Sequence, residues 1–242
     1  MTRTKSGVPG LDEVLEGGIP EGSTILVTGG SGTGKSILCS QFLYNGITQY
    51  GENGVFVSLE ERPQDLRAEM AEFGWDFQKL EDEGKLLLID ASTIKIPVKV
   101  DKGFAWGLGY DIEKLMTLVS AGVKKIDARR AVVDCLPALE FGLENTLDVR
   151  RAIFNLASLL LELECTSLMT TETIDPDRIS RYGVEEFILK GVIVLDLILK
   201  EGKIVRTITV RKMCRVRHSL ETYPFTIDEN GITIYPGEGV YI

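Results

Sequence analysis

The segment Ser23-Thr24-Ile25-Leu26-Val27-Thr28 runs directly into Gly29-Gly30-Ser31-Gly32-Thr33-Gly34-Lys35-Ser36, and this junction decides the fold. The first part is a short, apolar, β-branched run that is typical of a buried strand. The second part fits the pattern GxxxxGK[ST] throughout. Its glycines let the backbone bend so that successive N–H groups point at phosphate oxygens, while Lys35 reaches the β- and γ-phosphates and the Ser36 hydroxyl binds Mg²⁺. The junction therefore predicts a Mg-triphosphate site.

The residues after this loop supply the context that the pattern requires. Apolar side chains recur at helical spacing through Ser36–Tyr50, so the loop lies between a strand and a helix. The start of that helix adds its positive dipole end to the same anion site.

The rest of the chain predicts an α/β fold, a three-layer sandwich with a mostly parallel central sheet. Strands alternate with helices up to about residue 171, and no repeat or linker interrupts 1–242, which favours one domain. The region Ala91–Gly109 has glycines, a proline and no clear period, so we expect it to be irregular. Strands are expected at Val55–Leu59, Lys85–Asp90, Ala131–Asp134 and Thr166–Thr170, and helices at Pro63–Phe73, Asp111–Ile126 and Thr146–Leu163.

The last quarter of the chain has a different pattern. Val192–Leu199 and Lys203–Val210 flank the turn residues Glu201-Gly202, which indicates a β-hairpin. We expect antiparallel strands here at one edge of the sheet.

Composition excludes several classes of function. The chain has one histidine and four cysteines without a CxxC pair, which excludes a typical zinc site and a disulfide framework. The net charge of −9 opposes non-specific nucleic-acid binding, although Arg211–Arg217 is locally basic.

The length and position of the apolar runs predict a cytoplasmic protein. The apolar run Gly191–Leu199 is about half the length that a bilayer-spanning helix needs. No apolar segment follows the basic start Met1–Pro9, so we expect no secretory signal and no membrane partner.

Carboxylates near predicted strand ends are candidates for metal binding and catalysis. The apolar strand Ala131–Asp134 ends in Asp134, which could hold the Mg²⁺ shell, and Asp90 competes for this role. Glu60 and Glu61 follow the second strand at the sheet edge where ligands bind, and could orient the attacking water. A structural interpretation of this pair, as charges preceding the helix at Pro63, stays open.

Together these residues resemble the KaiC family within the RecA-like P-loop NTPases, as a single KaiC domain of the archaeal type. The approach to the loop, Gly7–Pro20, resembles the family pattern almost residue for residue. The resemblance covers nearly the whole chain. It extends over Glu60-Glu61, Val132–Asp134, Thr170–Glu172, Ser180–Phe187, His218-Ser219, Tyr223–Ile227 and Gly231-Ile232.

The resemblance implies an ATPase that uses ATP and Mg²⁺ and assembles as a homohexameric ring with ATP between subunits. It implies that Lys35, Glu60 and Glu61 are catalytic and that Asp134 is the Walker B acid. Thr170–Glu172 would lie close enough to respond to the nucleotide. It also implies roles toward a neighbouring subunit: contacts to phosphates by Lys212 and His218, and contacts to adenine by Ile227 and Glu229.

One position departs from the family pattern. The family has Lys-Met/Leu-Arg where this chain has Lys212-Met213-Cys214, so the arginine finger is replaced. If the strand continued, Arg215 would point to the opposite face from Cys214, so it is no direct substitute. Hydrolysis could therefore be slow.

Three functions stay open. The first is a ring-forming, KaiC-like ATPase with a regulatory or signalling role. The second is an ATP-binding scaffold or switch with negligible hydrolysis, and the third is a RecA-like DNA recombination or repair motor. The sequence identifies no protein client.

Overall fold

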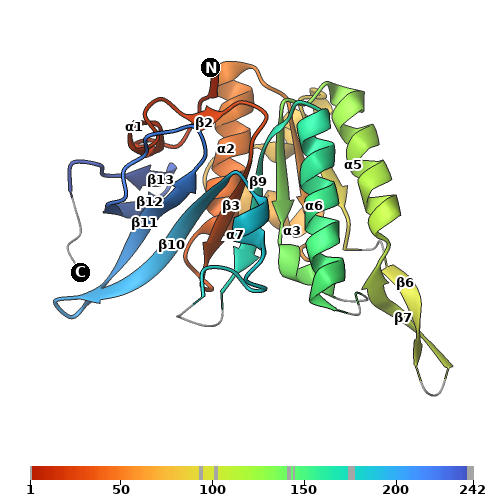
Figure 1. Cartoon of the computed structure of the whole chain (residues 1–242). Helices are drawn as coiled ribbons and strands as arrows, with labels where there is room; N and C mark the ends of the chain where they lie inside the picture. Colours follow the sequence, from red (N-terminus) through yellow and green to blue (C-terminus); the bar gives the residue numbers. More distant parts are fainter. Residues whose placement is uncertain are drawn as a thin grey trace.

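Strands and helices alternate along most of the chain in the computed structural model (Figure 1). It describes residues 2–92, 95–100, 103–140, 143, 145–173 and 178–238. The elements are β1 (Arg3–Thr4), α1 (Leu11–Val14), β2 (Ile19–Pro20), β3 (Thr24–Gly29), α2 (Lys35–Tyr50), β4 (Gly54–Ser58), α3 (Pro63–Ala71), α4 (Phe77–Asp82), β5 (Leu86–Asp90), β6 (Lys95–Val100), β7 (Gly103–Tyr110), α5 (Ile112–Ile126), β8 (Arg130–Asp134), a 3-10 helix (Leu136–Glu140), α6 (Thr146–Glu162), β9 (Thr166–Glu172), α7 (Glu185–Ile188), β10 (Gly191–Lys200), β11 (Lys203–Met213), β12 (Thr222–Asp228) and β13 (Gly231–Ile234).

A nine-stranded sheet forms the middle layer, in the order β13-β12-β11-β10-β3-β9-β8-β4-β5. Strands β10, β3, β9, β8, β4 and β5 run parallel to one another. Strands β11, β12 and β13 are added at one edge in antiparallel order. The predicted mostly parallel sheet with antiparallel C-terminal strands is confirmed.

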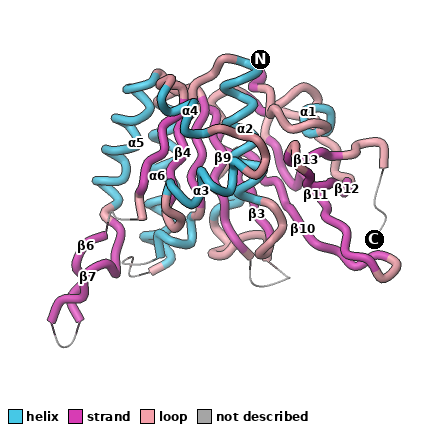
Figure 2. The backbone as a smooth tube through the Cα atoms, turned by 180° about the vertical axis from the view of Figure 1, so that it is seen from behind, coloured by secondary structure: helices cyan, strands magenta, loops and turns pink. Residues whose placement is uncertain are grey.

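Helices cover both faces of the sheet, which completes the three layers. Helices α1 to α4 contribute apolar side chains to one core, and α5 and α6 contribute to the other. Figure 1 shows α5 and α6 in front of the sheet, and the reverse view in Figure 2 brings α2, α3 and α4 to the front. In the part of the chain that the structure describes, no helix is both long and apolar enough to cross a bilayer.

The region predicted to be irregular, Ala91–Gly109, contains a hairpin instead. Strands β6 and β7 pair antiparallel, with a register shift around Pro97, and the hairpin projects from the body of the molecule (Figure 1). The prediction was wrong because Pro97 and the glycines of β7 break the alternation that marks a strand. The positions 93, 94, 101 and 102 lie outside the described residues.

A buried arginine connects the sheet to α2. The Arg130 side chain is 0% exposed; its Nε lies 2.7 Å from a Glu52 carboxylate oxygen, and its Nη1 donates to the Phe42 carbonyl at 3.0 Å. The guanidinium also lies over the Phe42 ring, 4.5 Å from the centroid. It fits because α2 has Gly46 at the contact, where a Cβ would lie 2.2 Å from Arg130 Nε.

We expect Gly46→Ala to destabilise the protein, although alanine is the better helix former by about 1 kcal/mol. The added methyl group displaces a buried, paired guanidinium, so the free energy of unfolding should fall by about 3 kcal/mol. Urea unfolding measures the change. Gly237→Ala is the control, because its Cβ would meet nothing within 4 Å. Equal or greater stability of Gly46→Ala would contradict the packing described here.

Candidate functional site

The loop between β3 and α2 forms a cradle that only glycine permits at two positions. Gly29 has φ 156° and a Cβ there would lie 2.2 Å from the Leu195 carbonyl oxygen. Gly34 has φ 102°, and its Cβ would lie 2.9 Å from Ile227 Cδ1. A Cβ at Gly30 or Gly32 would meet nothing within 4 Å, so this side of the loop is open.

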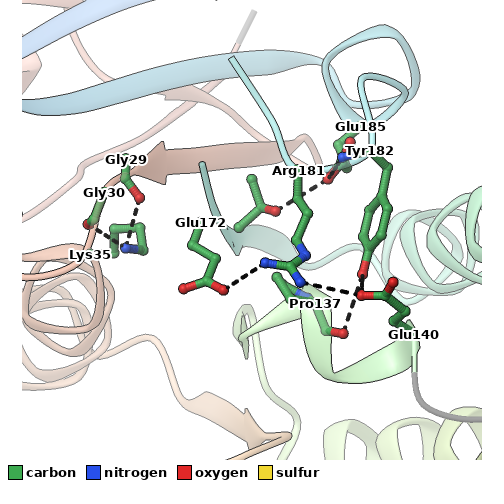
Figure 3. A network of polar contacts seen from close by, with 10 residues as sticks. Gly29, Gly30, Lys35, Pro137, Glu140, Glu172, Arg181, Tyr182 and Glu185 are labelled. Atoms are coloured by element: carbon green, nitrogen blue, oxygen red, sulfur yellow. Dashed lines mark hydrogen bonds and ion pairs between the residues drawn. The ribbon is translucent and has the colours of Figure 1, made fainter. Parts of the chain in front are cut away.

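Lys35 begins α2 and its amine lies on the inner side of the loop. Its Nζ donates to the carbonyl oxygens of Gly29 and Gly30, each at 2.9 Å (Figure 3). The first N–H groups of α2 lack partners within the helix, and the helix dipole is positive here. An ammonium group, free N–H groups and a helix N-terminus at one loop are suited to a polyphosphate.

The loop opens onto a cavity of about 640 Å³. The adjacent parallel strands β3, β9, β8 and β4 all end at this edge, which is where open α/β sheets bind ligands. The volume is within the usual range for small-molecule sites. The lining residues are Ser31, Gly32, Gly34, Lys35, Ser36, Ile37, Ser58, Glu60, Glu61, Glu69, Asp134, Cys135, Glu172, Arg206 and Ile227.

The paired glutamates after β4 both line this cavity. Burial raises the pKa of the Glu61 carboxyl to about 7, and the negative charges of Glu69, Asp134 and Asp65 add to the effect. Burial also raises the pKa of Glu60, with further contributions from Glu172 and Asp134.

The two residues proposed to hold the metal also meet in the cavity. Ser36 comes from the start of α2 and Asp134 from the end of β8, and the Thr170 hydroxyl donates to Asp134 Oδ1. The competing Asp90 is absent from the cavity lining and instead accepts bonds from the backbone and hydroxyl of Ser92. This arrangement favours Asp134 over Asp90.

The donor set fits magnesium. Among the residues whose placement the structure gives, no three His, Cys, Asp or Glu side chains form a metal-binding group. Mg²⁺ in nucleotide sites is typically held by one or two protein ligands together with phosphates and water. A hydroxyl and one carboxylate beside a phosphate cradle match that pattern.

The residues expected to act toward a neighbouring subunit have contacts within their own chain. Lys212 Nζ donates to the carbonyls of Glu186 and Leu189 at 2.9 and 2.8 Å, near the end of α7. His218 Nδ1 lies 2.9 Å from the Ser219 carbonyl oxygen. Their roles toward a neighbour, and that of Glu229 at the exposed β12–β13 turn, stay predictions.

Two features of the C-terminal strands bear on these predictions. Ile227 lines the cavity of its own chain beside Gly34, and its predicted contact to the adenine of a neighbouring subunit stays a prediction. Strand β11 ends at Met213, and Arg215 has φ 67° in a turn. The strand does not continue to Arg215, so strand alternation does not fix the direction of the Arg215 side chain relative to that of Cys214.

Several cavity residues had not been singled out as site residues in the sequence. Arg206 comes from β11 and Glu69 from α3, and both are far from the loop in sequence. Arg206 lies five residues before the basic segment Arg211–Arg217, and Glu69 is one of several acidic residues in and around α3. Cys135 follows Asp134 directly, and burial raises its thiol pKa to about 12, which opposes nucleophilic chemistry at neutral pH.

Comparisons with known proteins agree with this geometry. The family model described as "ATPase: KaiC" matches residues 4–239. The UPF0273 protein MJ1359 of Methanocaldococcus jannaschii is 39% identical over 98% of this chain and 97% of its own length. The crystal structure of the KaiC-like protein PH0186 from Pyrococcus horikoshii has a TM-score of 0.85 and 46% identity, covering 97% of this chain and 99% of that one.

The clock proteins are similar over part of their length. The circadian clock oscillator protein KaiC of Synechococcus elongatus is 38% identical over 98% of this chain, which spans 44% of that protein. The family match across nearly all residues, the cradle and the fold lead to one conclusion: this chain belongs to the KaiC family of ATPases.

Proposed function

We propose that this protein binds Mg-ATP in the cavity at the β3–α2 loop and hydrolyses it to ADP and phosphate. The observation that carries the proposal is the meeting of Lys35 and Ser36 with Glu60, Glu61 and Asp134 around one cavity. Phosphate binding and water activation need such groups on opposite sides of the transferred phosphoryl group.

Each group has a proposed task. The amides of Gly29–Gly34 and the Lys35 amine bind the phosphates, and Ser36 with Asp134 holds Mg²⁺. Magnesium, when bound, supplies charge neutralisation on the phosphate oxygens. Glu60 or Glu61 takes a proton from the attacking water as its oxygen bonds to the γ-phosphorus and the bond to the leaving ADP oxygen breaks.

Calorimetry tests the binding half of this proposal directly. Titration of Mg-ATP into the protein should release or absorb heat and saturate at one nucleotide per chain. Phosphate release above background then tests hydrolysis. Absence of any binding signal would contradict the proposed function as a whole.

The rate of hydrolysis should depend on pH if Glu61 is the base. We expect phosphate release at saturating Mg-ATP to rise with pH and to level off above about 7, the pKa to which burial raises this carboxyl. Glu61→Gln should remove this pH dependence along with most of the rate. A profile that is flat from pH 5.5 to 8.5, roughly the window over which such a base titrates, would exclude Glu61 as the base.

The same shift affects stability with a defined sign. The folded chain keeps the Glu61 proton up to about 7, whereas the reference value is 4.5. The folded state therefore binds more protons in this window, so this group lowers the free energy of unfolding as the pH rises from 4.5 towards 7.

A switch with negligible hydrolysis is the second candidate. Cys214 occupies the position where the family has an arginine finger, and Arg215 lies in a turn rather than on the strand. Loss of such an arginine can lower the rate by several orders of magnitude. Turnover clearly above background by the assembled protein would count against this candidate.

We further propose a homohexameric ring of cytoplasmic subunits, on the basis of the family resemblance. We propose that each subunit is a single domain, because one nine-stranded sheet includes both β3 and the C-terminal strand β13. We expect size-exclusion chromatography with light scattering to give a particle several times heavier than 26.7 kDa when Mg-ATP is present. A monomer under these conditions would contradict the ring and the proposed roles of Lys212 and His218 toward a neighbour.

A further inference from the structure

The proposed nucleotide cavity is strongly acidic. Its lining includes the carboxylates Glu60, Glu61, Glu69, Asp134 and Glu172, against two lining cations, Lys35 and Arg206. An ATP molecule carries several negative charges of its own, and like charges in a partly desolvated cavity repel strongly. Besides the proposed Mg²⁺, a cation behind the cavity wall that offsets one of these carboxylates would therefore favour nucleotide binding.

Glu172 is the carboxylate nearest to the phosphate loop by backbone register. It ends β9, and its register partner on β3 is Gly29, the first residue of the loop. Arg181 Nη1 donates to Glu172 Oε1 at 3.0 Å, and Nη2 lies 3.5 Å from Glu140 Oε2 (Figure 3). The Arg181 guanidinium thus lies behind Glu172, on the side away from Lys35 (Figure 3).

The segment that carries Arg181 is held in place by a buried carboxylate. Glu185 is 0% exposed and accepts hydrogen bonds from the Thr171 hydroxyl at 3.2 Å and the Ser180 hydroxyl at 2.7 Å. It also accepts from the backbone N–H groups of Tyr182 and Val184 at 3.4 and 3.1 Å. Four donors around one carboxylate attach residues 180–184 to β9 next to Glu172.

A second contact orients the same segment. The Tyr182 hydroxyl donates to the Pro137 carbonyl at 3.2 Å, in the 3-10 helix that follows Asp134 (Figure 3). Arg181 is thus connected to the ends of both β9 and β8, the strands that bring Glu172 and Asp134 to the cavity. These contacts fix the backbone on both sides of Arg181, so the Arg181–Glu172 ion pair differs from one between two mobile surface side chains.

We propose that Arg181 is a positioning residue for nucleotide binding: it neutralises Glu172 and holds it at the cavity wall, so that anionic phosphates can occupy the same space. This proposal rests on the proposed Mg-ATP site and assigns no contact between Arg181 and the nucleotide. Arg181 also adds positive charge near Glu60, and this charge lowers the pKa of Glu60 against the larger raising effect of burial.

The test changes the charges of Arg181 and Glu172, singly and together, and measures the affinity for Mg-ATP. Arg181→Met leaves Glu172 unpaired, so the Kd for Mg-ATP, measured by calorimetry, should rise by about tenfold. Glu172→Gln should bind at least as tightly as the parent. The double variant Arg181→Met/Glu172→Gln should return to within about threefold of the parent, because both the cation and the anion that it offsets are gone.

Two comparisons separate charge from structure. The effect of Arg181→Met should be larger for ATP than for ADP, because the repulsion scales with phosphate charge. Arg181→Lys keeps the charge and should restore most of the affinity. The matched control is Arg129→Met, which removes an arginine paired with Glu164 at 2.9 Å beyond the opposite end of β8 and should leave the Kd unchanged.

The proposal has clear failing outcomes. The role of Arg181 would be overturned by a Kd for Mg-ATP in Arg181→Met equal to that of the parent. It would also be overturned if the double variant bound Mg-ATP as weakly as Arg181→Met does. Either result would leave the proposed ATP site intact. No binding by the parent would instead overturn the site itself. Thermal unfolding shows whether Arg181→Met folds. If it does not fold, the Glu172→Gln variant tests the proposal instead. Weaker ATP binding by Glu172→Gln than by the parent would refute the proposed effect of the Glu172 charge.

Discussion

Lys35→Ala should raise the Kd for Mg-ATP by about 100-fold, because it removes a charge-assisted contact to the phosphates worth roughly 3 kcal/mol. The fold should be retained, since the Lys35 amine contacts only two loop carbonyls of its own segment in the hydrogen bonds that the structure gives it. Calorimetry with Mg-ATP measures the affinity, and thermal unfolding without nucleotide checks the fold.

The control for this variant is Lys124→Ala, which removes an exposed lysine in the last turn of α5. It should bind Mg-ATP as the parent does. In contrast, parent-like affinity in Lys35→Ala would mean that the glycine-rich loop is not the phosphate site, and the proposed function would have to be abandoned.

Replacing the catalytic candidates should separate binding from chemistry. Glu60→Gln and Glu61→Gln keep side-chain size but cannot accept the proton of the attacking water. We expect the variant that lacks the base to lose about 10²- to 10⁴-fold in phosphate release. The Kd for Mg-ATP should stay equal or become lower, because a negative charge leaves the cavity.

The double variant should be little slower than the slower single variant, because groups that act on one proton transfer are not additive. Glu69→Gln is the matched control: Glu69 also lines the cavity and removing its charge should tighten ATP binding. Its phosphate release should stay within about threefold of the parent, since a nearby charge acts only through the pKa of the base. Equal rates in the parent and the double variant would exclude both glutamates from catalysis.

The sequence determined the phosphate loop and the parallel part of the sheet. Both depend on local signals: glycines at positive φ within Gly29–Gly34, and apolar runs that end in polar residues such as Asp134. The antiparallel C-terminal pair was also predictable, because Glu201-Gly202 is a turn signal between two apolar strands. These features are encoded within a few residues of one another.

Local sequence signals failed at two places in the β-structure. The β6–β7 hairpin was missed because glycines and Pro97 hide its alternation, although the two strands are adjacent in sequence. The end of β11 at Met213 was also invisible, because Cys214 and Arg215 carry no breaker residue. The backbone conformation at Cys214, where the family has its arginine finger, was therefore known only from the tertiary structure.

Only the tertiary structure decided which distant side chains share the cavity. Arg206 and Glu69 reach it from an antiparallel strand and from α3, and Ile227 reaches it within its own chain. The link from Glu185 through Arg181 to Glu172 depends on an irregular segment attached to β9. Such contacts follow from strand order and chain crossings, which set distances between residues that no sequence period relates.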